Sequence, residues 1–397
     1  MKAIFERLKS LKRPTQVKLV NGDKFVAAVR SGNLLAMKTY SLGKTDLDVN
    51  FADPQNGRTA LHYAVISGKI EFVELMMRLE PDPSITDSDG QTALAIAVEN
   101  NFQRAIKMMV ECKKAPIEAV NANGETTLNI ALRVQQEKVA LFLLDRGASL
   151  EQSLRHAVNK KRWEQIRWLC AHKAHPDILD GQGYTPLCKA IVDGVVGDVR
   201  LWANLGSNLN FTGGNGPLLR LKGFSPLMVA IEMERREIID EILARPGIDL
   251  ATMSPNGANA ISFALRNGDM RTVRQIDQCG FKLSQSPPTL DGLTPLMFAA
   301  QSGRLEAVQW VVEREPDSIN QQDSIGWTAI FYATQKLSLD VVDFLISRGA
   351  KIDLVSKDHK FNLRRVAMSQ MSKLPPDSHK QKEAAKELLS RFSSLAS

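Results

Sequence analysis

The sequence predicts an all-α fold, a solenoid of helix-turn-helix units joined by short β-hairpin fingers. Eight related lines recur along the chain, and their glycines stand at 57, 90, 124, 183, 223, 257, 292 and 326. In seven of these lines Thr or Ser stands two residues after the glycine and is followed by Leu or Ile and then by Ala, and the line from Gly257 has Asn259 in place of the Thr or Ser. Most of these glycines are 33 to 35 residues apart, which is the length of one helix pair with a hairpin turn. A chain of 397 residues is too long for one compact core, whereas a repeat array can grow without limit.

Each element of the unit follows from its residues. Thr or Ser can cap the first helix by accepting a backbone N–H bond. Pro186, Pro226 and Pro295 would then occupy the first helical turn, where proline's missing donor costs nothing. The Leu and Ala of each line share one helix face. Apolar residues at helical spacing follow, as in the second half KIEFVELMMRLEPDP from Lys69, and predict the second helix.

These lines resemble the T-P-L-H-x-A motif of the ankyrin repeat, and the resemblance covers roughly residues 21–370. It implies an ankyrin-repeat solenoid in which the fingers and first helices form a concave surface. Members of this family bind other proteins on that surface. The resemblance also implies that His62, at the histidine position of the motif, bonds between repeats.

The repeats suggest three parts of the chain. Residues 1–20 form a basic amphipathic segment, with Ile4, Phe5, Leu8 and Leu11 on one face, which either caps the first repeat or binds a membrane surface. Residues 21–359 form an array of about ten units, and residues 360–397 form closing helices. An open solenoid end must be covered, which favours the capping role for both ends.

Two fingers depart from the period. Near Leu150 about seven residues are missing, so we expect a shortened finger before a repeat that begins at Ser153. Between residues 210 and 223 the finger is long, and its tip carries Leu218, Leu219 and Leu221. These leucines either pack against adjacent repeats or bind a partner.

Composition limits the class of protein. No run of 18 apolar residues occurs and the N-terminus lacks a signal-peptide core, so we expect a soluble protein. The four cysteines lie far apart, which fits a reducing cytoplasm. The net charge of +7 comes from basic ends, +5 in residues 1–20 and +5 in residues 351–397, around a body of −3. This distribution does not indicate a continuous nucleic-acid stripe.

No catalytic chemistry is indicated. Cys170, His172 and His175 are of types that bind zinc, but they lie at the end of a second helix and its turn, so we expect structural roles and no metal. His62 is expected to be structural rather than catalytic, because the repeat places no nucleophile or carboxylate beside it. We predict no enzyme, no cofactor and no small-molecule substrate.

A candidate binding strip follows the repeat glycines. The residue after the repeat glycine is polar in three early repeats, at Arg58, Gln91 and Glu125, and large and apolar in four later ones, and Phe361 stands in the same place after Lys360. Large apolar and aromatic side chains anchor protein interfaces, although they can also fold back on neighbouring fingers. With mixed residues at the first-helix ends, the candidate partner-binding set is Tyr184, Phe224, Leu293, Trp327, Phe361, Met233, Arg266, Gln301 and Gln335.

These observations predict a monomeric, cytoplasmic adaptor or scaffold that binds an unidentified protein partner. The alternative is nucleic-acid or anionic-membrane binding through the basic ends. Because ankyrin arrays also occur in proteins that intracellular bacteria deliver to hosts, a secreted effector is a further alternative on resemblance alone.

Overall fold

The computed structural model describes residues 21–42, 47–111, 115–213, 222–375 and 377–394. Its residues divide into two compact units, one up to Ala174 and the other from His175. No helix among the described residues combines the length and apolar character needed to cross a bilayer. The predicted N-terminal segment 1–20 and the finger leucines 218, 219 and 221 lie outside the described residues.

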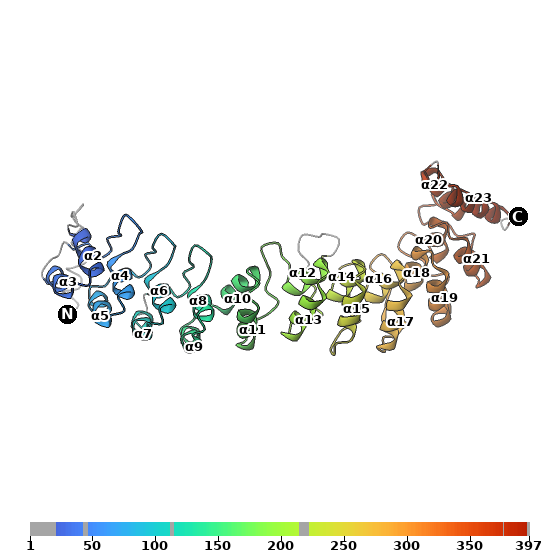
Figure 1. Cartoon of the computed structure of the whole chain (residues 1–397). Helices are drawn as coiled ribbons and strands as arrows, with labels where there is room; N and C mark the ends of the chain where they lie inside the picture. Colours follow the sequence, from blue (N-terminus) through green and yellow to red (C-terminus); the bar gives the residue numbers. More distant parts are fainter. Residues whose placement is uncertain (1–20, 43–46, 112–114, 214–221, 376, 395–397) are drawn as a thin grey trace, which may run out of the picture. The chain divides into compact units, whose positions relative to one another are not determined.

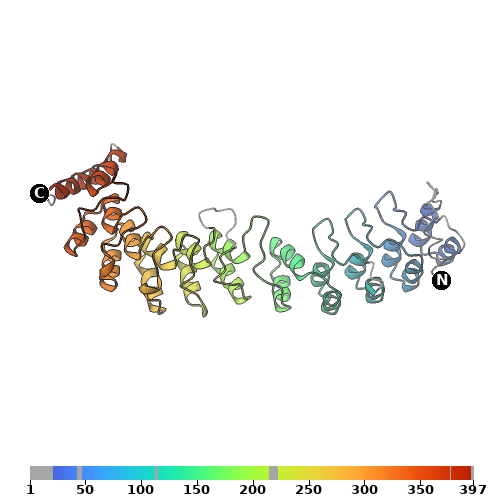
Figure 2. The same ribbon diagram turned by 180° about the vertical axis from the view of Figure 1, so that it is seen from behind.

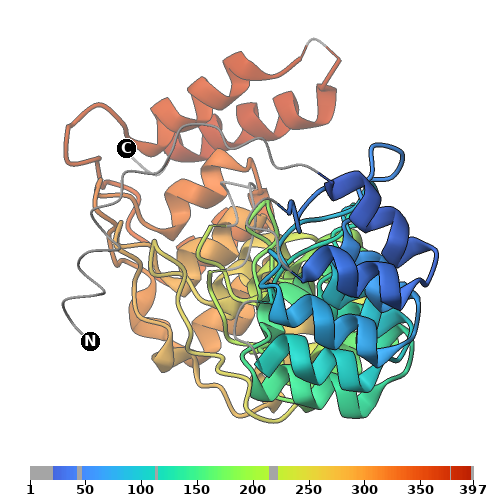
Figure 3. The same cartoon turned by 90° about the vertical axis from the view of Figure 1, so that its left-hand side faces the viewer.

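The first unit is a row of helix pairs (Figures 1 and 2). Its helices are α2 (Gly22–Arg30), α3 (Leu34–Ser41), α4 (Ala60–Ile66), α5 (Ile70–Arg78), α6 (Ala93–Glu99), α7 (Gln103–Glu111), α8 (Thr127–Arg133), α9 (Glu137–Asp145), α10 (Leu150–Asn159) and α11 (Trp163–Ala171). Within the row each first helix contacts the next, α2 with α4, α4 with α6, α6 with α8 and α8 with α10. Figure 3 views this unit from its N-terminal end, with α2 and α3 nearest the reader.

The second unit repeats the same plan. Its helices are α12 (Pro186–Asp193), α13 (Val196–Asn204), α14 (Pro226–Glu232), α15 (Arg236–Leu243), α16 (Ala260–Asn267), α17 (Met270–Gln278), η2 (Leu283–Gln285), α18 (Pro295–Ser302), α19 (Leu305–Arg314), η3 (Pro316–Ser318), α20 (Ala329–Gln335), α21 (Leu339–Ser347), α22 (Leu363–Lys373) and α23 (His379–Ser394). The first helices again stack in order, and α22 packs on α20. Both units therefore have the all-α architecture of an ankyrin array.

The first helices begin as the motif predicts. Thr92, Thr185 and Thr294 stand at N-cap positions, and each side chain accepts a hydrogen bond from the backbone N–H three residues on. Pro186 and Pro295 follow such caps in the first turn. The caps satisfy N–H groups that a helix terminus would otherwise leave unpaired, so these three repeats begin their first helix at the same motif position.

The core lies between neighbouring helix pairs. The motif's Leu and Ala are almost completely buried in each repeat, as Leu61 and Ala64 illustrate. Behind them the second helices bury one apolar side, for example Phe72 and Met76 on α5. A single helix pair is too thin to enclose these residues, so burial comes from stacking on the next pair.

The fingers are tight turns rather than long strands. Isolated antiparallel bridges close four of them, Ala52 to Thr59, Thr86 to Thr92, Val120 to Thr126 and Val355 to Asn362. Adjacent fingers are joined by single backbone bonds, in which the N–H of Ser88 donates to Asn56 at 2.8 Å and that of Ala122 to Asp89 at 3.0 Å. These bonds fix each finger against its neighbour.

The repeat near residue 150 differs from its prediction in one detail. Its first helix begins at Leu150 rather than at Ser153, because the Ser149 side chain caps it by accepting the N–H of Gln152. Only residues 146–149 separate α9 from α10. Ser153 is fully buried inside the helix, and its hydroxyl lies 2.8 Å from the Thr126 hydroxyl of the preceding repeat.

Close approach between fingers yields a test of this packing. Gly90 has φ of +69°, and a Cβ there would lie 2.7 Å from the backbone nitrogen of Ala122, whereas Gly68 has φ of +66° with nothing within 4 Å of that position. Gly68→Ala should therefore cost about 1 kcal/mol of unfolding free energy, for the left-handed backbone alone. Gly90→Ala should cost about 1–3 kcal/mol more, for the added overlap.

Urea unfolding followed by circular dichroism measures both variants. Equal losses of stability in Gly68→Ala and Gly90→Ala would contradict the finger-to-finger contact.

Candidate protein-binding surface

The predicted strip is only partly exposed. Tyr184 and Phe224 retain 8% and 9% exposure, so these two members of the predicted strip are not exposed. The Phe224 ring packs 4.6 Å from the ring of Phe263 in the next repeat. These two aromatics belong to the core between repeats, which is the alternative that the sequence left open.

The later members of the strip are accessible. Leu293 and Trp327 are half-buried and Phe361 is 39% exposed. The Trp327 ring stacks on the Phe331 ring, with their centroids 5.5 Å apart. It makes edge-to-face contacts with the rings of Tyr332 and Phe361, at centroid distances of 5.4 and 6.2 Å. Trp327 and Phe361 thus form one aromatic pair across two successive finger bases.

Hydrogen bonds hold Trp327 in place. The carboxylate of Asp323 accepts the backbone N–H of Trp327 at 2.8 Å and the hydroxyl of Tyr332 at 2.5 Å. Burial, with this bond to Asp323, raises the pKa of Tyr332 well above its ordinary value. The Tyr332 hydroxyl therefore stays protonated and continues to donate its hydrogen bond to Asp323. Asp323 in turn holds the backbone of Trp327, so these bonds position the aromatic pair.

The predicted residues at the first-helix ends have varied surroundings. Arg266 forms an ion pair with Glu232 and lies over the Phe263 ring, 4.9 Å from its centroid. Met233 and Gln301 are half-buried, and Gln335 is exposed. Phe263 thus contacts both Arg266 and Phe224. These residues belong to other repeats than Trp327 and Phe361.

Two exposed fingertip residues were missed by the sequence reasoning. Leu290 is 80% exposed and Ile325 is 51% exposed. Backbone bonds join their fingers, from Leu290 N–H to Asn256, from Ser324 N–H to Asp291 and from Lys357 N–H to Ile325. An apolar residue one or two places before a repeat glycine is the signal that could have found them. We call Leu290, Leu293, Ile325, Trp327 and Phe361 the finger surface.

The polar residues at the same position in the first unit are paired internally. Arg58 Nε lies 3.2 Å from a carboxylate oxygen of the buried Asp87. Gln91 donates to Glu99 at 3.0 Å. Glu125 is 3% exposed and accepts bonds from Asn121, Arg133 and Arg162 at 3.0, 3.2 and 2.7 Å.

These bonds set the ionisation of Glu125. Burial alone would raise its pKa, but the Asn121 hydrogen bond and the two guanidinium groups outweigh burial and lower it. The carboxylate therefore stays charged and pairs with both Arg133 and Arg162, and Arg133 pairs with Glu99 as well. Such pairing leaves this part of the first unit without a free cationic stripe.

The candidate metal residues have structural surroundings. Burial raises the pKa of the Cys170 thiol to about 11, which disfavours the thiolate that a metal requires. The His172 ring stacks 3.8 Å from Trp168 and its Nδ1 lies 2.8 Å from the Trp168 carbonyl. His175 is exposed beside Asp177. The described residues contain no group of three or more His, Cys, Asp or Glu that could hold a metal ion.

His62 connects two repeats. The backbone N–H of Thr59 donates to its Nδ1 at 3.1 Å, so the neutral ring carries its proton on Nε2, which lies 3.1 Å from the carbonyl of Gln91. The ring is 1% exposed. Its contacts give it a structural role at the base of two fingers.

Comparison with known proteins identifies related sequences. A family model described as ankyrin repeats in three copies matches residues 25–114, 68–153 and 261–356. Ankyrin repeat and SAM domain-containing protein 6 of Rattus norvegicus is 34% identical over 138 residues, which are 33% of this chain and 15% of that protein. The B-cell lymphoma 3 protein homolog of Mus musculus is 27% identical over 228 residues, which are 54% of this chain and 48% of that protein.

The chain thus spans about half or less of these curated relatives. Among solved structures, the crystal structure of the ankyrin repeat domain of Bcl-3, described as a unique member of the IkappaB protein family, is 26% identical. It matches with a TM-score of 0.42 and covers 56% of this chain and 97% of that one.

The buried His62 yields a pH prediction. Burial lowers its pKa below the ordinary value, and protonation of Nδ1 would also break the bond from Thr59. The unfolded chain therefore takes up a proton at this histidine before the folded chain does. Unfolding free energy should fall as the pH drops from about 7.5 to about 5.5, with a slope of up to about 1.4 kcal/mol per pH unit from this residue.

Denaturant unfolding across this pH range tests the prediction. His62→Gln should show a shallower slope than the wild type, and identical slopes in both proteins would show that His62 does not contribute. His156, whose pKa burial also lowers, offers a second variant, His156→Gln, with the same expected direction.

Proposed function

The chain belongs to the ankyrin-repeat family, and on that premise we propose that it is a non-enzymatic adaptor or scaffold that binds a protein partner through the finger surface of its second unit. Ankyrin repeats generally mediate protein–protein binding. The observation that carries the proposal is the accessible aromatic pair of Trp327 and Phe361, with its ring centroids 6.2 Å apart. A cytoplasmic location, inferred from the wide spacing of the cysteines, is part of the same proposal.

Apolar exposure on the fingers supports this assignment. Leu290, Ile325 and Phe361 expose 80%, 51% and 39% of their surface, on three successive fingers. Single exposed apolar residues are common, but a cluster of them marks an interaction site. Aromatic side chains such as Trp327 supply large contact areas at low entropic cost, and they dominate binding energy in protein interfaces.

Backbone hydrogen bonds hold the fingers that carry the finger surface in place. Each finger is bonded through its backbone to the preceding finger, at 2.9 Å for Leu290, 2.8 Å for Ser324 and 2.9 Å for Lys357. The Asp323 carboxylate also accepts the backbone N–H of Trp327 at 2.8 Å. A preorganised surface loses little conformational entropy on association, which favours stable binding to one partner.

The first-helix ends would form the margin of the contact. Gln301 and Gln335 provide amide groups near the aromatic repeats, whereas Met233 and Arg266 belong to earlier repeats of the same unit. A polar margin around an apolar centre is the usual composition of a protein interface. Tyr184 and Phe224 are buried, so they would stabilise the packing between repeats rather than contact the partner.

Removing the aromatic pair tests the proposal. Phe361→Ala removes an exposed ring and should weaken partner binding by about 1–2 kcal/mol with little loss of fold stability. Trp327→Ala should weaken binding by about 2 kcal/mol or more, as expected of a central anchor. The partner is captured from cell extract by the wild-type chain, identified by mass spectrometry, and its affinity for each variant is measured by calorimetry.

Leu141→Ala is the matched control, because Leu141 is also 39% exposed but lies on α9 in the first unit. Arg58 is a poor control because it pairs with the buried Asp87 of another repeat. Unchanged affinity of both aromatic variants, measured per folded molecule, would contradict the proposal.

The competing hypothesis is binding of nucleic acid or anionic membrane by the basic ends. Residues 351–397 carry ten Lys and Arg against five Asp and Glu, and α22 and α23 expose Arg364, Lys380 and Lys386. Such binding would depend on neutralising phosphate charges, whereas apolar contacts would not.

Salt dependence separates the two hypotheses. Between about 50 and about 200 mM salt, partner affinity should change by less than about threefold if the finger surface binds. A loss on the order of a thousandfold, typical of six or more phosphate contacts, would favour the basic ends.

A further inference from the structure

The finger at residues 121–124 lacks a following finger within the first unit. In regular repeats, the residue before the repeat glycine accepts a backbone N–H from the following finger. Five pairs of fingers have this bond, at 2.8 to 3.0 Å: Ser88 to Asn56, Ala122 to Asp89, Leu290 to Asn256, Ser324 to Asp291 and Lys357 to Ile325. After 121–124 the following finger would come between α9 and α10, where only residues 146–149 separate the helices. None of the described residues donates a hydrogen bond to the equivalent carbonyl, that of Asn123.

The repeat glycines show the same difference. In five repeats a Cβ on the repeat glycine would lie 2.7 to 3.2 Å from a backbone atom of the following finger, at Gly57, Gly90, Gly257, Gly292 and Gly326. For Gly124, the only described atom within 4 Å, apart from its chain neighbours, is Nδ1 of His156 at 3.5 Å. Asn123 and Gly124 are both exposed. We call the Asn123 carbonyl and Gly124 the open edge.

The fingers that occupy the equivalent edges elsewhere in the chain show what fits this one. Each is a tight turn. In the turn that begins at Asp87, the N–H of Asp87 donates to Gln91 and that of Gly90 donates back to Asp87, both at 2.9 Å. The second residue of the turn, Ser88, donates the bond to the preceding finger. A short polar residue opens each of the five bonded turns, and the residue three places later has a positive φ: Asp87, Asn121, Thr289, Asp323 and Ser356, followed by Gly90, Gly124, Gly292, Gly326 and His359.

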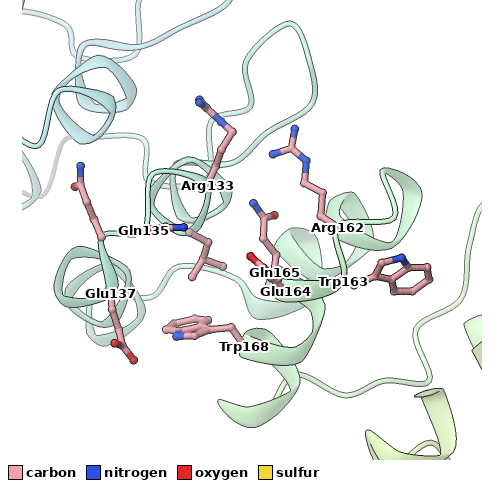
Figure 4. Close-up of a pocket in the computed structure, with 10 residues that line it drawn as sticks. Arg133, Gln135, Glu137, Arg162, Trp163, Glu164, Gln165 and Trp168 are labelled. Atoms are coloured by element: carbon pink, nitrogen blue, oxygen red, sulfur yellow. The ribbon is translucent and has the colours of Figure 1, made fainter. Parts of the chain in front are cut away.

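Ion pairs hold the finger where it joins α8. Glu125, the next residue after the repeat glycine, accepts bonds from Arg133 and Arg162 at 3.2 and 2.7 Å. Figure 4 shows both arginine side chains extending on the same side of α8 and α11. They also line a pocket of about 660 Å³, together with residues of α11 that include Gln165 and Trp168. The fingertip remains exposed, so these ion pairs hold the finger without covering its open edge.

We propose that the open edge binds a tight turn of a partner protein, which takes the place of the missing finger. The second residue of that turn donates its backbone N–H to the Asn123 carbonyl, as Ser88 does to Asn56. The turn opens with Asp, Asn, Ser or Thr and has Gly three residues later, because the chain's own fingers combine these features. Main-chain hydrogen bonding to an unpaired edge is a general mode of peptide recognition. This site lies in the first unit and does not rest on the function proposed for the finger surface.

The test selects disulfide-closed loops of random sequence from a phage library on the full chain. Loops that also bind the Gly124→Ala chain are removed first, because the new methyl group would overlap the backbone of a turn on the open edge. The remaining loops, made as synthetic peptides, should share the predicted turn sequence. By calorimetry, Gly124→Ala should bind them at least about tenfold more weakly than the wild type.

Methylation of single peptide nitrogens identifies the bond itself. N-methylation at the second residue of the turn removes the donor to Asn123 and should lower affinity by at least about tenfold. N-methylation outside the turn should leave affinity unchanged.

Gly68→Ala is the matched control. Gly68 and Gly124 have φ of +66° and +76°, and in both a Cβ avoids backbone overlap in the free chain. The two variants should therefore have similar melting temperatures, and only Gly124→Ala should lose the loops. Phe361→Ala should bind them as the wild type does, so the open edge and the finger surface can fail separately.

Three outcomes would overturn the proposal. One is that no loop remains after the selection. Another is that methylation at the second residue of the turn leaves affinity unchanged. The third is that the chain forms a dimer that Gly124→Ala dissociates, because a second copy of the chain would then occupy the open edge.

Discussion

The structure depends on burial between repeats rather than within them. One helix pair presents its Leu and Ala, such as Leu94 and Ala97, to the neighbouring pair, and these residues are almost completely buried only because the next pair covers them. The small alanine lets helices approach closely, and a capping Thr, Ser or Asn, such as Thr92, Ser225 or Asn259, begins the first helix at the same motif position in several repeats. The fingers and the surface pockets are positioned by this stack of helix pairs. Local changes in stacking therefore determine where a partner can bind.

The helix pairs could be predicted from the sequence because their signals are local. Caps such as Thr185 and prolines such as Pro186 act within one turn of helix, and both stand where the motif predicts. The exposure of the residue after each glycine could not be predicted in the same way. Phe224 is buried because Phe263 of the next repeat lies against it, whereas Phe361 has no such cover and stays exposed. That difference depends on neighbouring repeats.

The repeat near residue 150 shows the same limit. Its missing residues were evident from the spacing, but Ser149 as the cap was not, because Ser153 fits the motif better. Gln165 could have indicated altered packing from the sequence alone, because its amide stands where other repeats have an apolar residue. Its consequence, a pocket with unpaired atoms on Gln136 and Trp168, required the packing of α11. The pocket near Trp168 and the exposed finger surface thus both occur where individual repeats depart from the regular packing of the stack.

The central claim is that a protein partner contacts the finger surface. Site-specific photocross-linking tests it most directly, with a photoreactive phenylalanine analogue in place of Phe361 and, in a separate protein, in place of Leu141, which has the same 39% exposure. Irradiation in cell extract should join one protein species to the chain labelled at position 361 and not to the chain labelled at 141. Cross-linking of that species at position 141 alone, or equally at both positions, would contradict the account.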